Sequence, residues 1–265
     1  MKLVLLTSIF LLGAIGKTQG SSCWTRYILA GEYPYLAMVI PDCEKYFSQA
    51  TSIAAIVSPN FVLGLYTNPG IKCKYTVRIG ADDQGKDGIM SNVEKVIIHE
   101  VLKNDSNPTH QLVLYKLTEP IQTDPWIDSI QVPQERPKTG DAGVVVGFRN
   151  GDRKGYGSKV FRMKRNVTSE EDWRALNDGL PVEKQRSIPK GSLATVYLSD
   201  GCPRVQTSIL VVNRQLAGFM DKRGRMTING TKFEADGFVD VAYYKDWIEN
   251  NIQTPSAASQ IDHSS

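Results

Sequence analysis

The apolar residues of this chain occur in short runs that are rich in β-branched side chains and are separated by turn-forming clusters. The runs cover residues 35–40, 53–57, 61–65, 75–79, 93–98, 112–117, 143–148, 193–198, 209–212 and 215–220. Runs of this length and composition are typical of β-strands, and clusters such as Ser58-Pro59-Asn60 and Asn68-Pro69-Gly70 mark the turns between them. The pattern predicts a mostly β protein of the sandwich or barrel class.

Two stretches depart from this pattern. Residues 169–177 open with acidic side chains and predict a short helix. In residues 241–252, Tyr244, Trp247, Ile248 and Ile252 recur at helical spacing, which predicts a helix that docks one apolar face on the body. The polar residues 253–265 that follow are expected to form a disordered tail.

The composition excludes several classes of protein. With 265 residues, 41% hydrophobic and 22% charged, the chain is long and apolar enough for a real core, so disorder, collagen and coiled coil are unsuitable assignments. A formal net charge of +3 gives no reason to expect nucleic-acid binding, which needs basic residues massed on one face.

The first twenty residues favour export from the cell. Lys2 precedes an apolar run over residues 3–15, and the small residues Thr18 and Gly20 follow at the position that a signal peptidase reads. The alternative, a membrane anchor, needs a longer apolar run, and no other segment approaches that length. We expect residues 1–20 to be a signal peptide and the mature protein to be secreted, extracellular and without a membrane span.

The mature chain keeps Cys23, Cys43, Cys73 and Cys202. In an oxidising compartment four cysteines favour two disulfides, and sequence alone permits three pairings. Their scatter does not match a zinc-ligand spacing, and we expect neither a metal nor a cofactor. Three glycosylation sequons, at Asn104, Asn166 and Asn229, are consistent with secretion.

Five segments of the chain resemble, in order, conserved parts of the chymotrypsin-like (trypsin-like) serine proteases. They are GEYPY at 31–35, SPNFVL at 58–63, HQLVLYKL at 110–117, LVVNRQLAG at 210–218 and VAYYKDWI at 241–248. The resemblance spans nearly the whole mature chain. It implies an all-β fold of two six-stranded antiparallel barrels with a short C-terminal helix, as one domain over residues 21–252.

The same resemblance implies that the catalytic side chains are replaced. A serine protease uses a hydroxyl nucleophile, an imidazole base and a carboxylate that orients the base. Thr67 stands at the histidine position, Gln111 at the carboxylate position and Gln206 at the serine position. Threonine does not act as a general base near neutral pH, and a neutral amide does not stabilise an imidazolium. We therefore expect a protein without protease activity.

Other positions depart from the family in the same direction. Arg204 falls at the oxyanion glycine, and Val205 falls at the aspartate that binds the freed N-terminus of an active enzyme. After Arg26 the chain reads Tyr27-Ile28-Leu29-Ala30 in place of the family's activation sequence. Two family disulfides have also lost both ends, at Ser52 with Asn68 and at Gly143 with Val212. The alternative is an active secreted endopeptidase with a displaced site, such as Ser208 with His99 or His110 as base.

The resemblance also suggests a former specificity pocket. Asp200, two residues before Cys202, stands where trypsin-like enzymes carry the acid that selects Arg or Lys, and Arg223 replaces a glycine at the pocket mouth. We expect Arg223 to fill the pocket and to pair with Asp200 through two hydrogen bonds.

Cys43 and Cys73 fall in loops that flank the former histidine site, which favours a bridge between them and leaves Cys23 for Cys202.

Basic residues are concentrated between positions 149 and 165. They are Arg149, Arg153, Lys154, Lys159, Arg162, Lys164 and Arg165, and Asp152 is the acid among them. Strand alternation from Lys159 onward suggests that much of this charge lies on one face, where it would bind an anionic glycan or acidic protein. The alternative is a solvated strand face.

The expected function is non-catalytic binding of unidentified extracellular proteins, in a fluid such as seminal fluid or saliva. The rival function is sequestration of a small ligand between the barrels.

Overall fold

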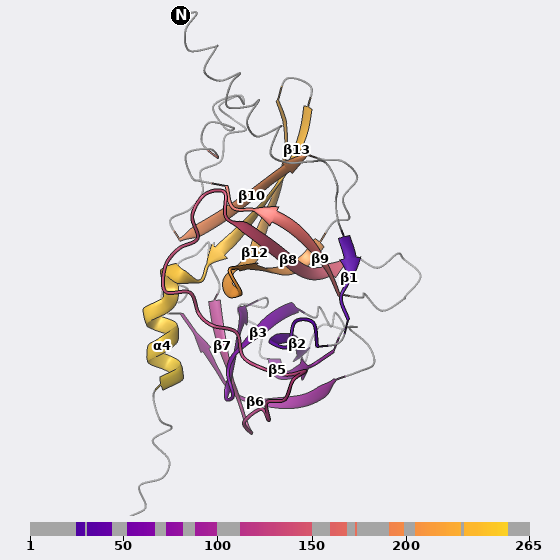
Figure 1. Ribbon diagram of the computed structural model, residues 1–265. Helices are drawn as coiled ribbons and strands as arrows, with labels where there is room; N and C mark the ends of the chain where they lie inside the picture. Colours follow the sequence, from indigo (N-terminus) through magenta and orange to yellow (C-terminus); the bar gives the residue numbers. More distant parts are fainter. Residues whose placement is uncertain are drawn as a thin grey trace, which may run out of the picture.

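The computed structural model consists of two β-sheet bodies stacked on each other, with a helix against one side (Figure 1). It describes residues 25–29, 31–43, 52–66, 73–81, 88–99, 112–149, 160–168, 173, 191–198, 205–228 and 231–253. Apart from residues 25–27, which join the upper body, the N-terminal part of the described chain forms the lower body and the C-terminal part forms the upper one. This is the all-β double-barrel architecture that the sequence predicts.

The lower body is a closed antiparallel barrel with the strand order β2-β3-β4-β7-β6-β5. Its strands are β2 (Leu36–Cys43), β3 (Ser52–Ser58), β4 (Phe61–Leu65), β5 (Cys73–Ile79), β6 (Ile89–Ile98) and β7 (Leu112–Leu117). The side chains of β3 show why these strands read as continuous apolar runs. Ala54 and Ile56 point into the barrel, whereas the alternate residues Ile53, Ala55 and Val57 pack in the core shared with the upper body. Strands buried on both faces have no polar side to display.

The upper body is a seven-stranded sheet with the order β1-β9-β8-β11-β12-β13-β10. Its strands are β1 (Thr25–Tyr27), β8 (Ala142–Arg149), β9 (Val160–Asn166), β10 (Ser192–Leu198), β11 (Val205–Val212), β12 (Gln215–Ile228) and β13 (Thr231–Asp240). Strand β10 returns to the end of β9 through Thr168, whose amide donates to the carbonyl of Ala194 at 2.8 Å. The hydroxyl of Thr168 accepts a hydrogen bond from the amide of Val196 at 3.1 Å. Six strands thus form a second barrel, and β1 is added beside β9.

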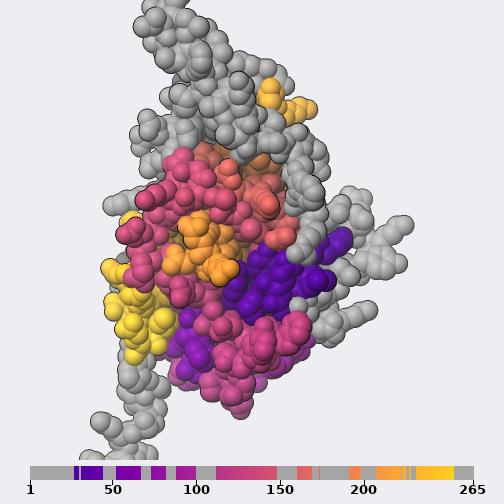
Figure 2. Space-filling model, in the orientation of Figure 1, coloured from indigo at the N-terminus to yellow at the C-terminus, as the bar shows by residue number. Residues whose placement is uncertain are grey.

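The segment 118–141 connects the two barrels and holds them together. Ile130 donates its amide to the carbonyl of Ile56 in the lower barrel at 2.8 Å, and the carbonyl of Gln131 accepts from Leu216 in the upper barrel at 3.1 Å. Figure 2 shows this magenta segment on the surface beside the orange turn between β11 and β12. That turn contains Asn213 and Arg214, both at positive φ.

The chain ends in a 3-10 turn, η2 (Ala242–Tyr244), and a helix, α4 (Lys245–Gln253), where the sequence predicts a helix over 241–252. Tyr244 and Ile248 are buried in the core between the barrels, as the helical spacing predicts.

Other predicted segments are described only in part. Within the predicted helix over 169–177 the structure describes one residue, Trp173, which is helical. Residues 1–20 and 254–265 lie outside the described residues, so the signal peptide and the tail stay predictions. No helix in the described part of the chain is long and apolar enough to cross a membrane.

All the predicted strands are present, but three strands were not among the predicted runs. They are β1, β9 and β13. Strand β13 reads TKFEADGFVD, and its acidic residues interrupt the apolar pattern. Glu234, Asp236 and Asp240 are nevertheless buried in the upper barrel. Strand β12 also continues to Ile228, well beyond the predicted end at residue 220, because it pairs with β13 from Gly218 to Ile228.

Candidate functional site

The positions that the resemblance assigns to the histidine and the carboxylate follow β4 and precede β7. These two strands are neighbours, and Leu65 at the end of β4 pairs with Leu112 at the start of β7. Thr67 comes two residues after β4 and Gln111 directly before β7, so the topology attaches both to the same end of the lower barrel. Both residues lie outside the described residues, and their assignment stays a prediction.

The position assigned to the nucleophile lies at the start of β11, a strand of the upper barrel that contacts β3 of the lower barrel. The register between β11 and β8 shifts between Val205 and Thr207, which leaves Gln206 as the extra residue of a bulge. Thr207 accepts a hydrogen bond from the amide of Ile53 in β3 at 3.0 Å. The backbone of Gln206 is therefore held at the junction of the barrels, while its side chain and Arg204 lie outside the described residues.

The displaced site that the sequence left open, Ser208 with a histidine base, is not assembled among the described residues. Ser208 is 1% exposed, and its hydroxyl has no hydrogen-bond partner in the described part of the chain. His99 packs instead against the C-terminal elements, with its ring edge-on to Tyr244 at 4.9 Å and to Trp247 at 5.1 Å between centroids. A nucleophile needs both access to substrate and an adjacent base, and Ser208 shows neither. His110 lies outside the described residues.

Arg223 forms the centre of a charged cluster inside the upper barrel. Its Nε donates to Oδ1 of Asp236 at 2.7 Å and lies 3.9 Å from Oε2 of Glu234. Its Nη2 donates to the hydroxyl of Tyr197 at 3.2 Å and approaches Oδ2 of Asp236 at 3.5 Å. The partner predicted for Arg223 was Asp200, which lies outside the described residues. The described ion pairs join Arg223 to the acids of β13, because Arg223 and Asp236 are register partners of β12 and β13.

A second arginine completes the cluster. The guanidinium of Arg165 lies over the ring of Tyr197, 3.7 Å from its centroid. Burial, followed by the charge of Asp236, raises the pKa of Tyr197 to about 12. Burial by itself lowers the pKa of Arg223, but the hydrogen bond to Asp236 and the electrostatic interactions with Asp236, Tyr197 and Glu234 together outweigh this and leave the pKa above its ordinary value. The cluster therefore contains two guanidinium cations and two carboxylates around a neutral phenol.

The basic stretch at 149–165 is divided between two faces. Lys164 is exposed, and Arg162 on the same face lies 3.5 Å from Oε1 of Glu32. The prediction of one charged face is wrong for Arg165, which is 8% exposed and points into the barrel. Arg153, Lys154, Lys159 and the side chain of Arg149 lie outside the described residues. The described part thus presents little uncompensated charge for an anionic glycan.

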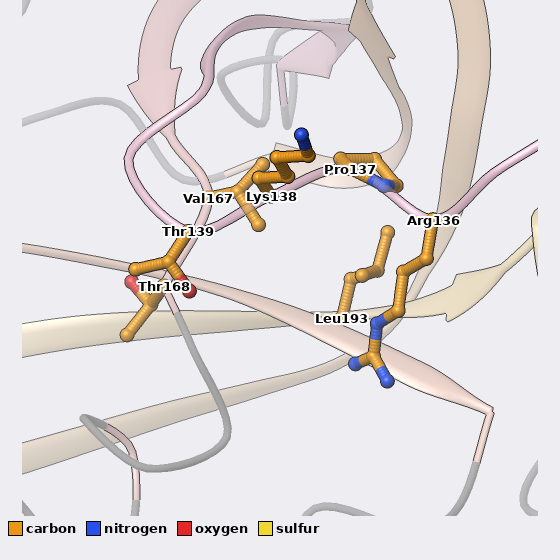
Figure 3. Close-up of a pocket in the computed structure, with 7 residues that line it drawn as sticks. All are labelled: Arg136, Pro137, Lys138, Thr139, Val167, Thr168 and Leu193. Carbon is orange, nitrogen blue, oxygen red and sulfur yellow. The ribbon is translucent and has the colours of Figure 1, made fainter.

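A groove of about 510 Å³ lies where the upper barrel closes between β9 and β10 (Figure 3). Its walls include Val167, Leu193, Thr168 and the inter-barrel residues 136–139. Arg136 extends along one end of the groove, where it donates to the carbonyl of Ser192, and its Nε lies 3.3 Å from the buried carboxylate of Asp240. The guanidinium is thus already bound within the chain. Sequence reasoning missed this pair, although a single acid inside the apolar run GFVDV is a signal for a buried ion pair.

The cysteines and the sequons are partly described. Cys43 at the end of β2 and Cys73 at the start of β5 form a disulfide, which confirms the predicted bridge. Cys23 and Cys202 lie outside the described residues, and so do Asn104 and Asn229. Asn166 ends β9 and is half-buried.

The two positions of a lost family disulfide are adjacent in the structure. Gly143 in β8 is the register partner of Val212 in β11. A Cβ added to Gly143 would lie 3.0 Å from Cγ2 of Val212. This adjacency supports the residue-by-residue correspondence from which the catalytic positions were assigned.

Comparisons with known proteins are consistent with this correspondence. No family model matches the chain. Trypsin eta of Drosophila melanogaster is 25% identical over 184 residues, and the match covers 64% of this chain and 64% of the length of that protein. Neuropsin, a serine protease expressed in the limbic system of mouse brain, has a structure that matches with a TM-score of 0.64 at 17% identity, over 87% of this chain and 99% of that chain. The structural match shows that the two chains share a fold.

Proposed function

Because the chain is a homologue of the trypsin-like serine proteases with the chymotrypsin fold, we propose that it is a secreted, non-catalytic member that acts by binding other proteins. The observation that carries this proposal is the set of residues at the catalytic positions, Thr67, Gln111 and Gln206. None of the three supplies the nucleophile, base or orienting carboxylate that acyl transfer requires. A fold keeps its shape when its site is lost, so binding through the surface is the function that remains.

The N-terminal segment supports the same proposal. Residues 25–27, at the position of the family's activation site, form β1 and pair with β9, with Arg26 opposite Arg162. The amide of Ile28 donates to the carbonyl of Val160 at 3.1 Å, and the Ile28 side chain is buried. An uncut chain thus has a stable place for this segment. Val205, at the position of the acid that would bind a freed N-terminus, offers no charge for a cut one.

The test of inactivity is labelling of the purified mature protein with a fluorophosphonate, together with a peptide-substrate assay. We expect no label and no hydrolysis, with trypsin as the positive control. Ser208→Ala serves as the matched variant: label on the natural protein that disappears in Ser208→Ala would establish a displaced serine site and overturn the proposal. Label that persists in this variant would contradict it equally.

The binding role has its own test. Tagged mature protein is used to recover partners from the fluid in which it is secreted, which we propose to be seminal or salivary. We expect a stoichiometric extracellular protein in the recovered complex. Recovery of a small molecule without any protein would favour the rival role, sequestration of a ligand between the barrels.

A further inference from the structure

We propose that Asp236, Glu234 and Tyr197 form a binding site for a guanidinium or amidinium group, which Arg223 of the same chain occupies. The site lies on β13 and β10 and uses different acids from Asp200, the pocket acid that the resemblance implies. It stands on geometry alone, so it holds or fails independently of whether the protein is catalytic.

The contacts around Arg223 are those of a recognised guanidinium, because its Nε and Nη2 each donate to an acceptor of the cluster. The Nε of Arg223 and its Nη2 approach the two oxygens of Asp236, at 2.7 and 3.5 Å respectively. The hydroxyl of Tyr197 accepts from the same Nη2 at 3.2 Å and donates to Oδ2 of Asp236, also at 3.2 Å. A planar fork that meets a carboxylate at two atoms is specific for guanidinium and amidinium, because an ammonium has no such fork.

Burial separates the site from the group that fills it. Asp236, Tyr197 and Glu234 are 0%, 5% and 6% exposed, so the receiving groups belong to the interior of the barrel. The side chain of Arg223 is 21% exposed and enters from β12. Buried carboxylates at two positions of one strand require compensating cations. Arg165 lies over the ring of Tyr197 and is one such cation, and Arg223 supplies the second.

The strand that carries Arg223 is less firmly held than the strand that forms the site. Strand β13 pairs with β12 on one side and with β10 on the other over Phe233–Val239. Strand β12 pairs with β11 as far as Phe219, and among the described residues its part beyond Met220 pairs with β13 alone. The Nη1 of Arg223 is buried and has no hydrogen-bond partner in the described part of the chain. Because β13 is also paired with β10, the site should stay formed when the Arg223 side chain is removed. A guanidinium from solution would then bind there.

The experiment is chemical rescue of Arg223→Ala, followed by thermal unfolding. We expect Arg223→Ala to unfold at a lower temperature than the natural protein, because Asp236 stays buried without its cation. Millimolar methylguanidinium or benzamidine should raise this temperature in a saturable way. Methylammonium should bind more weakly, by a factor of about ten at least. The natural protein should show no such rise, since its site is occupied.

Two variants make the result specific. Arg223→Ala combined with Asp236→Asn removes the carboxylate and should abolish the response to methylguanidinium. Arg162→Ala removes a surface arginine paired with Glu32 and should give no response. An unresponsive Arg223→Ala, or an equal response in either control variant, would overturn the proposal.

A folding defect in Arg223→Ala does not remove the test. The variant is then refolded with methylguanidinium or with sodium chloride at the same concentration. Recovery of folded protein that depends on methylguanidinium supports the site. Equal yields in the two salts contradict it.

Discussion

A single ion pair at the closure of the upper barrel shows how this fold accommodates a buried charge. Asp240 is 1% exposed, and its carboxylate is approached by the Nε of Arg136 at 3.3 Å. Oδ1 of the same carboxylate accepts from the amide of Ala242 at 3.1 Å, where the 3-10 turn begins. Burial raises the pKa of Asp240 above its ordinary value, and Arg136 opposes that rise. The arginine thus limits the rise in pKa that burial causes at this carboxyl group.

Arg136→Gln should lower the free energy of unfolding by about 1–3 kcal/mol at pH 7, because Asp240 would lose its cation. The loss should be smaller at acid pH. A carboxyl group whose folded-state pKa is raised destabilises the fold once pH exceeds the unfolded value, and protonation removes this cost. Urea unfolding at pH 7 and in mild acid measures the loss in the free energy of unfolding at each pH. Arg136→Gln with Asp240→Asn is the control and should not share this pH dependence; an equal deficit for Arg136→Gln at both pH values would contradict the prediction.

At the scale of strands, the sequence predicts best where a strand is buried on both faces. Strands β2, β3, β4 and β7 have no polar side, so their length and β-branched content were sufficient. Strands β9 and β13 carry Arg165, Glu234 and Asp236, which a single sequence presents as surface charges. Their partners are on other strands, far away in the sequence. For the same reason the carboxylate bound by Arg223 could not be identified from the sequence.

The adjacency of β8 and β11 at one lost disulfide predicts that the bridge can be restored. A Cβ built on residue 143 lies 3.0 Å from Cγ2 of Val212, which is near the position that the sulfur would take in Val212→Cys. A disulfide requires about this distance between the Cβ of one cysteine and the sulfur of the other, so Gly143→Cys with Val212→Cys has suitable geometry. We expect the bridge to form and to add about 2–4 kcal/mol to the free energy of unfolding. Mass measurement without reduction and urea unfolding with and without reductant check this. The two single-cysteine variants are the controls, and free thiols in the folded double variant would refute the register.

At the scale of the whole molecule, buried phenols are spread through both barrels and the core between them. Burial is the main cause that raises the pKa of Tyr75, Tyr197 and Tyr244 to about 12. It also raises the pKa of Tyr35 and Tyr115. Each of these phenols stays neutral in the fold at a pH where an unfolded tyrosine, with a pKa near 10, is ionised.

The protein should therefore lose stability as pH rises from about 10 toward 12, because the unfolded chain releases protons that the fold retains. The slope should be about 1.4 kcal/mol per pH unit for each tyrosine that stays neutral. Circular dichroism and tyrosinate absorbance, followed in one titration, should change together for these residues. Ionisation of all the tyrosines near pH 10 with the circular dichroism unchanged would show that the phenols are accessible.

The way in which the upper barrel closes has a consequence for its motions. The lower barrel is hydrogen-bonded strand to strand around its whole circumference. In the described part of the upper barrel, β9 and β10 are joined through the amide and hydroxyl of Thr168, with Arg136 reaching Ser192 beside them. Separation of these two strands breaks few hydrogen bonds. Local opening should therefore begin at this junction, at a lower free-energy cost than unfolding of the whole molecule.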